Sequence, residues 1–328
     1  MRVVMTAAAR DRAGAELKKI VAAAVFIIVE APGVFYCNGQ PVAKKDVCPD
    51  VVWLSHDVWR YKLLGPLLEV AISQNPKWVQ GHMAGLDHPA WRKILLNGTR
   101  VTKSIGASVP VAEYVMAHAL SLMVPLDQQR QAQNAVRWVV TPYKEVRGSR
   151  WTIVGLGGIG REVAARAAAF GAQIIGVRRT PGIDQNFGTT HELEALPDLL
   201  READVVLLSI PATRKTHKLA DAAFFAALKP GAILINVARG SLIDYDALRA
   251  GLKVNRPAHA VLDTFEKEPL DRDSWLWTHP QVRVTAHTSW FGNKNGERMD
   301  AQFLENFARF AAGDPLVSEA DISEAELA

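Results

Sequence analysis

The chain has 328 residues, of which 49% are apolar and 22% are charged, and its formal net charge is +4. This is ordinary globular composition with enough apolar residues for a large core, and at roughly 100 to 200 residues per domain the length predicts two domains. The positive charges are spread along the chain, and no basic run is long or aromatic-interleaved enough to predict a nucleic-acid partner. Cys37 and Cys48 belong to no CxxC or Cys/His cluster, so we expect no metal site and a reducing, cytoplasmic location.

The first hundred residues show a weak alternation of helical and strand-like segments. The apolar run 20–29 is too short to cross a membrane, which takes about 20 residues, and it lies behind Asp11 and Glu16, unlike a signal peptide. We therefore expect it to be a helix end that runs into a buried strand, and we expect no membrane partner. The other expected elements here are helices within 15–24 and 65–74 and strands within 51–55 and 77–85.

From Trp151 onward, short apolar runs alternate regularly with helical segments. The runs do not alternate polar with apolar residues, which is typical of strands buried on both faces of a parallel sheet with crossover helices. This pattern predicts a doubly wound α/β domain. A helix with a long apolar face starts near Pro110 and could bridge two domains, and the last helix ends at Gly313. The expected strands are 151–154, 173–177, 203–210, 232–237, 258–263 and 281–287, and the expected helices are 161–170, 221–228 and 244–252.

The stretch IVGLGGIGREVA contains the dinucleotide-binding pattern GxGxxG. Gly155 permits the tight turn, Gly157 lets the backbone approach a pyrophosphate, and Gly160 lets the following helix pack close to the strand. Free N–H groups at the start of that helix would meet the phosphates, so Gly158 and Ile159 are also expected cofactor contacts. A Walker-type loop is not supported because no GK[ST] follows. The alternative is a glycine-rich turn with no ligand.

The end of the next strand carries arginines where the pattern expects an acid. An acid about 20 residues past the glycines usually holds the adenine ribose hydroxyls. Here Arg178, Arg179 and Thr180 occupy that place. Two guanidiniums can bind a 2′-phosphate that a carboxylate would repel, so we expect NADP to be preferred, with NAD possible. The alternatives are arginines that face solvent, or an arginine that stacks on adenine without reading any phosphate.

Three later segments each place one ionisable group at or just past a strand end, where doubly wound folds bind ligands. These groups are Arg239, Glu268 and His287. Histidine suits proton transfer to a carbonyl oxygen, a neighbouring carboxylate fixes its tautomer, and arginine binds a carboxylate and polarises the carbonyl. Together they form a set that can reduce a carbonyl. Each residue alone would more often be a surface charge or a structural histidine.

The ordered motifs NVARG, LDTFEKEPL and VTAHTS resemble those of the D-isomer-specific 2-hydroxyacid dehydrogenases, and the resemblance runs from about Lys77 to the last helix. It implies that Arg239 orients the substrate, that Glu268 is the partner of the histidine and that His287 is the general acid/base. It also implies that Asp263 contacts the nicotinamide side of the cofactor. The family usually has proline where Ala286 stands, a departure that could loosen this loop.

Further cofactor and substrate contacts follow from the same resemblance. HMAGLDH is similar to the loop whose backbone N–H groups hold the substrate carboxylate, and IPATRKT is similar to the loop beside the nicotinamide ribose and phosphates. Trp290 is expected to line the substrate site because it lies three residues past His287. The residues expected from these segments are Ala84 and Gly85 for substrate, and Ile210, Pro211, Thr216, Val237 and Ala238 for cofactor.

The resemblance implies two doubly wound α/β domains, one flavodoxin-like and one of the Rossmann type, with the active site in a cleft between them. Residues 1–107 with 296–328 would form the substrate domain and 108–295 the dinucleotide-binding domain. Members of the family are usually homodimers joined through the cofactor domain. The first seventy-odd residues match poorly, so the strand order there stays open.

The expected activity is reduction of a small 2-oxo acid to a D-2-hydroxy acid, with glyoxylate or hydroxypyruvate as the preferred substrate by analogy. Formate and phosphite dehydrogenases resemble the same family, and nothing in the sequence commits the pocket to an inorganic substrate. Some corepressors also share this scaffold and sense the cofactor instead of using it. They tend to carry long disordered extensions, and only about 15 residues follow the last helix here.

Overall fold

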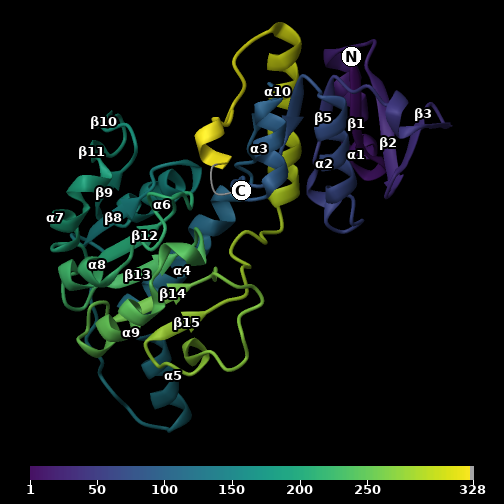
Figure 1. Cartoon of the computed structure of the whole chain (residues 1–328). Helices are drawn as coiled ribbons and strands as arrows, with labels where there is room; N and C mark the ends of the chain where they lie inside the picture. Colours follow the sequence, from purple (N-terminus) through teal and green to yellow (C-terminus); the bar gives the residue numbers. More distant parts are fainter. Residues whose placement is uncertain (326–328) are drawn as a thin grey trace. The chain divides into compact units, whose positions relative to one another are not determined.

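The computed structural model describes residues 1–325 and divides into two compact units (Figure 1). Unit 1 comprises Met1–Ala107 and the C-terminal segment that begins at Asn293, and unit 2 comprises Ser108–Gly292. The chain passes from one unit to the other twice, at residues 107–108 and 292–293.

Unit 1 is built on a seven-stranded sheet in the order β4-β3-β2-β1-β5-β6-β7. Five of these strands are parallel and follow the flavodoxin-like order, namely β2-β1-β5-β6-β7. The antiparallel hairpin β3–β4 extends the sheet beyond β2. The sequence left this order open because β4, β5, β6 and β7 have only three residues each. The strands are β1 (Arg2–Thr6), β2 (Val25–Ala31), β3 (Val34–Cys37), β4 (Gln40–Val42), β5 (Val51–Trp53), β6 (Trp78–Gln80) and β7 (Arg100–Thr102).

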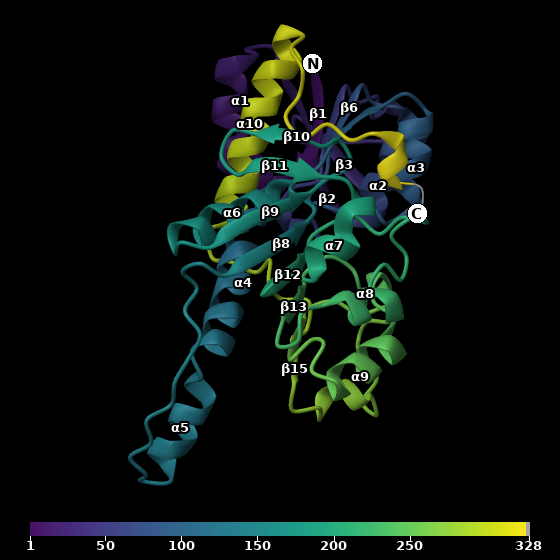
Figure 2. The ribbon, with the colours of Figure 1, turned by 90° about the vertical axis from the view of Figure 1, so that its left-hand side faces the viewer.

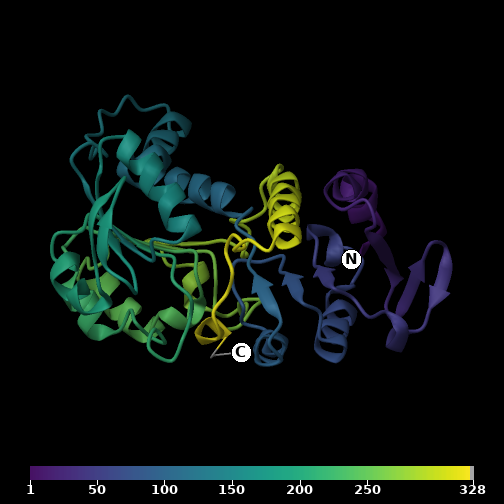
Figure 3. The same ribbon diagram turned by 90° about the horizontal axis from the view of Figure 1, so that it is seen from above.

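Helices cover both faces of the unit 1 sheet (Figure 3). The C-terminal helix α10 packs beside α1, and its Phe303 stacks on Trp53 of β5 with ring centroids 3.9 Å apart. Gly313 ends α10 with a φ of +81°, as the sequence predicts. The helices are α1 (Ala7–Ile20), α2 (Leu64–Gln74), α3 (Pro89–Leu96) and α10 (Asn295–Ala312), with short 3-10 turns η1 (Lys44–Asp46), η2 (His56–Val58) and η6 (Ile322–Ala325).

Unit 2 is built on an eight-stranded sheet in the order β10-β11-β9-β8-β12-β13-β14-β15. All neighbouring pairs are parallel except β10–β11, and the order from β11 to β14 is that of the Rossmann fold. The doubly wound α/β class predicted from the sequence is therefore confirmed. The strands are β8 (Arg150–Val154), β9 (Gln173–Val177), β10 (Gly182–Asp184), β11 (Gly188–His191), β12 (Val205–Leu208), β13 (Ile233–Asn236), β14 (His259–Leu262) and β15 (Val282–Val284).

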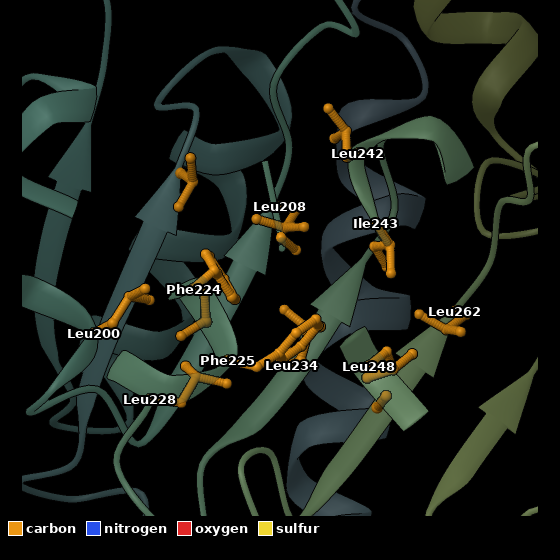
Figure 4. Packing of buried hydrophobic residues seen from close by; sticks show 14 of the residues in the cluster. Leu200, Leu208, Phe224, Phe225, Leu228, Leu234, Leu242, Ile243, Leu248 and Leu262 are labelled. Carbon is orange, nitrogen blue, oxygen red and sulfur yellow. The ribbon is translucent and has the colours of Figure 1, made fainter. Parts of the chain in front are cut away.

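The central strands of unit 2 are buried on both faces, which explains their unbroken apolar runs. On one face, Leu234 and Leu262 of the sheet pack with Phe224, Phe225 and Leu248 of the covering helices (Figure 4). On the other face, α4 and α6 lie against each other. The helices are α4 (Ser108–Met123), α5 (Leu126–Asn134), α6 (Gly158–Ala169), α7 (Leu196–Leu200), α8 (Ala222–Ala227) and α9 (Tyr245–Lys253), with short 3-10 turns η3 (Leu193–Ala195), η4 (Gly240–Leu242) and η5 (Trp275–Trp277).

Helix α5 and the stretch after it form an arm that leads away from the sheet of unit 2 (Figure 2). The side chains of Val136 and Trp138 on this arm are 92% and 98% exposed. Among the described helices none is by itself long and apolar enough to cross a membrane, and only the bent pair α4–α5 meets that criterion by length and composition.

Candidate active site

The glycine-rich turn between β8 and α6 leaves no room for side chains at two of its positions. Gly155 has a φ of +104°, and a Cβ there would lie 2.5 Å from the carbonyl oxygen of Ser209. A Cβ at Gly160 would lie 2.0 Å from the carbonyl oxygen of Gly155. Gly157 precedes α6 and has open space around its Cβ position, so a ligand can approach the backbone there. The turn thus has the form of a phosphate cradle at a helix N-terminus, with Gly158 and Ile159 in its first turn.

The arginine pair follows β9 directly. The Nε of Arg178 donates to the carbonyl oxygen of Thr180, and this bond folds the segment back on itself. The side chains of Arg179 and Thr180 are exposed. The structure therefore places all three predicted residues at the carboxyl end of β9, beside the strand that carries the glycine turn.

Asp184 is an acid in this region that sequence reasoning missed. It ends β10, and its side chain is only 3% exposed. Its Oδ2 lies 2.6 Å from Nη2 of Arg161 in the first turn of α6 and 3.9 Å from Nη1 of Arg178. The backbone N–H of Asn186 and the Arg161 guanidinium lower the pKa of this carboxyl. Its position, 24 residues past Gly160, is close to where the dinucleotide-binding pattern expects an acid. The sequence could not show that this acid pairs with arginines, because Arg161 and Arg178 belong to two other segments.

The loop after β12 packs directly on the glycine turn. A Cβ at Gly155 would lie 2.6 Å from Cγ2 of Ile210, so this side chain borders the cradle. Thr216 closes the loop, because its hydroxyl accepts from the backbone N–H of Thr213 at 2.7 Å and donates to the carbonyl oxygen of Pro211 at 2.9 Å. The three predicted cofactor residues, Ile210, Pro211 and Thr216, therefore lie in one hydrogen-bonded loop beside the glycine turn.

The loop after β13 carries Arg239 and is held by Asn236. The buried Asn236 side chain accepts from the backbone N–H of Ala238 at 3.1 Å and donates to the carbonyl oxygen of Arg239 at 2.9 Å. Val237 and Ala238 are buried beside it. A Cβ at the next residue, Gly240, would lie 2.0 Å from the carbonyl carbon of Phe265. The arginine loop therefore touches the backbone of the segment that leads to Glu268.

His287 and Glu268 are in hydrogen-bond contact, with 2.9 Å between Nδ1 of the imidazole and Oε2 of the carboxylate. The other carboxylate oxygen, Oε1, accepts from the backbone N–H of Phe265 at 2.9 Å. His287 has a φ of +48°, in the left-handed region that residues other than glycine adopt less often. Its own N–H donates to the carbonyl oxygen of Asp263 at 2.8 Å. The structure thus brings together two groups that are 19 residues apart in the chain.

Asp263 is fully buried beneath the His287 turn. Its Oδ1 accepts from the Thr285 hydroxyl at 2.6 Å and from the N–H of Thr288 at 2.9 Å, and its Oδ2 accepts from the N–H of Ser289 at 3.0 Å. These donors show a role that the sequence did not reveal, because Asp263 organises the turn that carries the imidazole. Its predicted contact with the nicotinamide stays a prediction.

Trp290 lies on the same turn and is 40% exposed. Its indole N–H donates to the carbonyl oxygen of His287 at 2.8 Å, so the ring is tied to the turn at its polar edge. The structure therefore places this predicted substrate residue on the turn that carries His287, three residues after the histidine.

The predicted carboxylate-binding loop follows β6 in unit 1. Ala84 is exposed and Gly85 is half-buried. The neighbouring His82 is buried, and burial lowers its pKa to about 4, so its imidazole is neutral at pH 7. His88 caps α3, where its Nδ1 accepts from the N–H of Ala90 at 3.2 Å.

Residues 116–289 match the family model described as the NAD binding domain of D-isomer specific 2-hydroxyacid dehydrogenases. The chain belongs to this family. The family predicted from the sequence is thereby confirmed, and so are its α/β fold and the enzyme class, an NAD(P)-dependent oxidoreductase of 2-hydroxy acids.

Among curated members of the family, the chain is similar to the (S)-sulfolactate dehydrogenase of Chromohalobacter salexigens, with 34% identity over 207 residues, 62% of this chain and 67% of the relative. It is also similar to the glyoxylate reductase of Pyrococcus horikoshii, with 37% identity over 172 residues, 52% of this chain and 51% of the relative. The chain thus spans about half the length of that reductase.

Two solved structures of the 2-hydroxyacid dehydrogenase family cover 98% of this chain and are covered to 98% themselves. One, from Xanthobacter autotrophicus Py2 in complex with NADPH and MES, is 28% identical with a TM-score of 0.74. The other, from Aeromonas salmonicida, is 29% identical with a TM-score of 0.71. The turn formed by Gly155, Gly157 and Gly160 fits a nicotinamide dinucleotide, since two glycines are sterically required and the third leaves open space.

Proposed function

We propose that this dehydrogenase reduces a small 2-oxo acid of the glyoxylate or hydroxypyruvate class and prefers NADPH. The observation that carries the proposal is the contact of the His287 imidazole with Glu268, beside the loop that bears Arg239. This is the chemistry that carbonyl reduction requires of the protein: a proton donor, a group that fixes its tautomer and a cation for the substrate.

The direction of the His287–Glu268 hydrogen bond assigns the two ring nitrogens. An ionised carboxylate only accepts, so Nδ1 carries the hydrogen that points to Oε2 of Glu268. This leaves Nε2 as the nitrogen that donates a proton to the substrate oxygen. The bound cofactor supplies the hydride for the carbonyl carbon. The imidazole side chain is 33% exposed, so solvent can return the proton to Nε2 afterwards.

Substrate recognition is assigned to charged and backbone donors. The Arg239 guanidinium presents a planar set of donors that matches a carboxylate. The backbone N–H groups at Ala84 and Gly85 are proposed as further carboxylate donors, and Trp290 as an apolar wall beside His287. The substrate of the glyoxylate reductase of Pyrococcus horikoshii supports a short 2-oxo acid as the first choice.

The preference for NADPH is proposed from the charges at the carboxyl end of β9. Asp184 lies 3.9 Å from Arg178, and it is buried against Arg161. It is therefore not available to hold a ribose diol as the acid of NAD-binding members does. Arg179 and Thr180 are exposed at the same strand end, where they can reach a 2′-phosphate.

A panel of 2-oxo acids tests the proposed reaction. We expect NADPH to be oxidised with glyoxylate and hydroxypyruvate, and more slowly with NADH in its place. Sulfopyruvate belongs in the panel because of the likeness to a sulfolactate dehydrogenase. Oxidation of formate or phosphite with NADP⁺ would instead favour a formate- or phosphite-type dehydrogenase, in which that compound donates the hydride. Absence of turnover with every compound, together with cofactor-dependent capture of a peptide, would favour a corepressor-like binding protein and contradict the proposal.

We also propose that the protein is a homodimer joined through unit 2. The arm after α5 exposes an apolar surface that a monomer would leave in water, including Val136, Trp138 and Val140. We expect a dimer by sedimentation velocity, and a monomer when Trp138→Asp and Val140→Lys are combined. Val254→Lys, at an exposed valine of unit 2 outside the arm, is the matched control and should stay dimeric. A wild-type protein that sediments as a monomer at micromolar concentration would contradict this proposal.

A further inference from the structure

A chain of hydroxyl groups connects α4 to the turn that carries His287. The phenol oxygen of Tyr114, on α4, lies 2.6 Å from Oγ1 of Thr285. Thr285 Oγ1 in turn lies 2.6 Å from Oδ1 of Asp263. The carboxylate of Asp263 then receives the backbone N–H groups of Thr288 and Ser289, which follow His287 directly.

The chemistry of these groups fixes the direction of each hydrogen bond. The Asp263 carboxylate only accepts, so the single hydroxyl hydrogen of Thr285 points to it. Thr285 can then only accept from Tyr114, whose phenol is therefore the donor at the start of the chain. Burial raises the pKa of Tyr114 to about 12, so this proton stays in place across the working range of an enzyme.

Asp263 accepts three successive backbone N–H groups of the turn, beginning with that of His287. Its carbonyl oxygen accepts the N–H of His287, while its carboxylate accepts the next two N–H groups. These three hydrogen bonds hold the backbone of His287 at a φ of +48°, in the left-handed region that residues other than glycine adopt less often. The Glu268 contact orients the ring itself, but it does not determine the backbone from which the ring projects.

We propose that Tyr114 and Thr285 are positioning residues that set the orientation of the His287 turn through Asp263. The inference rests on the proposed function of His287 as the proton donor. The Tyr114 and Thr285 hydroxyls act on the imidazole indirectly. They orient the Asp263 carboxylate, which in turn accepts the backbone N–H groups of the turn. Buried hydrogen-bonded groups of this kind rigidify a site when every member has a partner.

Substitutions that remove one hydroxyl at a time test the proposal. Thr285→Val is expected to lower kcat by about tenfold, and Tyr114→Phe by about threefold, because each removes one hydrogen bond behind the turn. Thr285→Ser keeps the hydroxyl and should retain the kcat of the parent enzyme. The dissociation constant for NADPH should stay within about twofold in all three variants, because the glycine turn and the arginine pair are unchanged.

Thr152→Val is the matched control, because Thr152 is a fully buried threonine of the same unit whose hydroxyl has no hydrogen-bond partner within residues 1–325. It should leave kcat unchanged. A second readout needs no substrate: hydrogen exchange at the amides of Thr288 and Ser289 should be faster in Thr285→Val than in the wild type or in Thr152→Val. The proposal is overturned if Thr285→Val matches the wild type in kcat and exchange, or if Thr152→Val loses as much activity. If the wild type reduces no 2-oxo acid, the proposed reaction fails, and the exchange experiment still decides whether the hydroxyl chain holds the turn.

Discussion

Replacing His287 with glutamine is expected to lower kcat by about 10²- to 10⁴-fold, the range of a lost general acid. Glutamine keeps a polar side chain of similar length beside Glu268, but it cannot donate a proton to the substrate and take one back. The affinity for NADPH should be nearly unchanged, because the glycine turn does not involve this side chain. Steady-state kinetics with glyoxylate, together with NADPH binding followed by fluorescence, measures both quantities.

Glu268→Gln provides the comparison for this substitution. It leaves an imidazole in place, but the amide NH₂ takes the position of Oε2 and donates to Nδ1. The ring is then held in the other tautomer and its protonated form loses the carboxylate, so we expect a loss in kcat that approaches that of His287→Gln. The amide oxygen can still accept from the backbone N–H of Phe265, so the loop should keep its conformation. Unchanged turnover in His287→Gln would remove this residue from the chemistry and with it the proposed mechanism.

The second large effect is expected at the arginine pair. Replacing Arg178 and Arg179 with alanine should raise the dissociation constant for NADPH by about 10- to 100-fold, as expected for the loss of one or two charge-assisted hydrogen bonds. The affinity for NADH should change much less, because NADH lacks the 2′-phosphate. Titration calorimetry with NADPH, NADH and 2′,5′-ADP measures this difference without any turnover.

The control for the arginine pair removes two positive charges elsewhere on unit 2. Arg201 pairs with Asp198 at the surface, and Arg249 lies over the ring of Trp275 on an exposed helix face. The Arg201→Ala and Arg249→Ala double variant should bind both cofactors like the wild type. Equal weakening of NADPH and NADH by the Arg178 and Arg179 substitutions would show that these side chains do not read the phosphate.

The sequence revealed most of unit 2 because its strands are buried on both faces. The apolar runs within 203–210 and 232–237 predicted strands without any alternation, and the structure has strands at 205–208 and 233–236. Glycine-containing turns marked several boundaries. The hairpin formed by β10 and β11 gave no such signal, because Gly182–Asp184 and Gly188–His191 are short, polar and partly exposed. In unit 1, the three-residue strands were too short to fix an order from sequence.

The candidate site was predictable where a motif lies within one segment. Gly155, Gly157 and Gly160 form such a motif, and the sequence also indicated which residues could pair after folding, such as His287 with Glu268. The supporting contacts were not predictable, because they join residues far apart in the chain. Tyr114 reaches Thr285 across 171 residues, and Asp184 meets Arg161 from a hairpin that had not been expected. Such contacts depend on how α4 packs near the end of β15 and how β10 lies beside α6, which no local sequence pattern specifies.

The absence of space beside Gly240 constrains how this enzyme can diverge. A single methyl group at that position would overlap the backbone at Phe265 and Glu266, with nominal separations of 2.0 Å and 2.2 Å. The loop that bears Arg239 and the loop that bears Glu268 thus pack backbone to backbone at Gly240. A substitution at Gly240 would therefore displace the other loop as well. If the loop around Ala84 and Gly85 binds the substrate carboxylate as proposed, it is the better place to seek new substrate preferences, because it lies in unit 1, outside this packing contact.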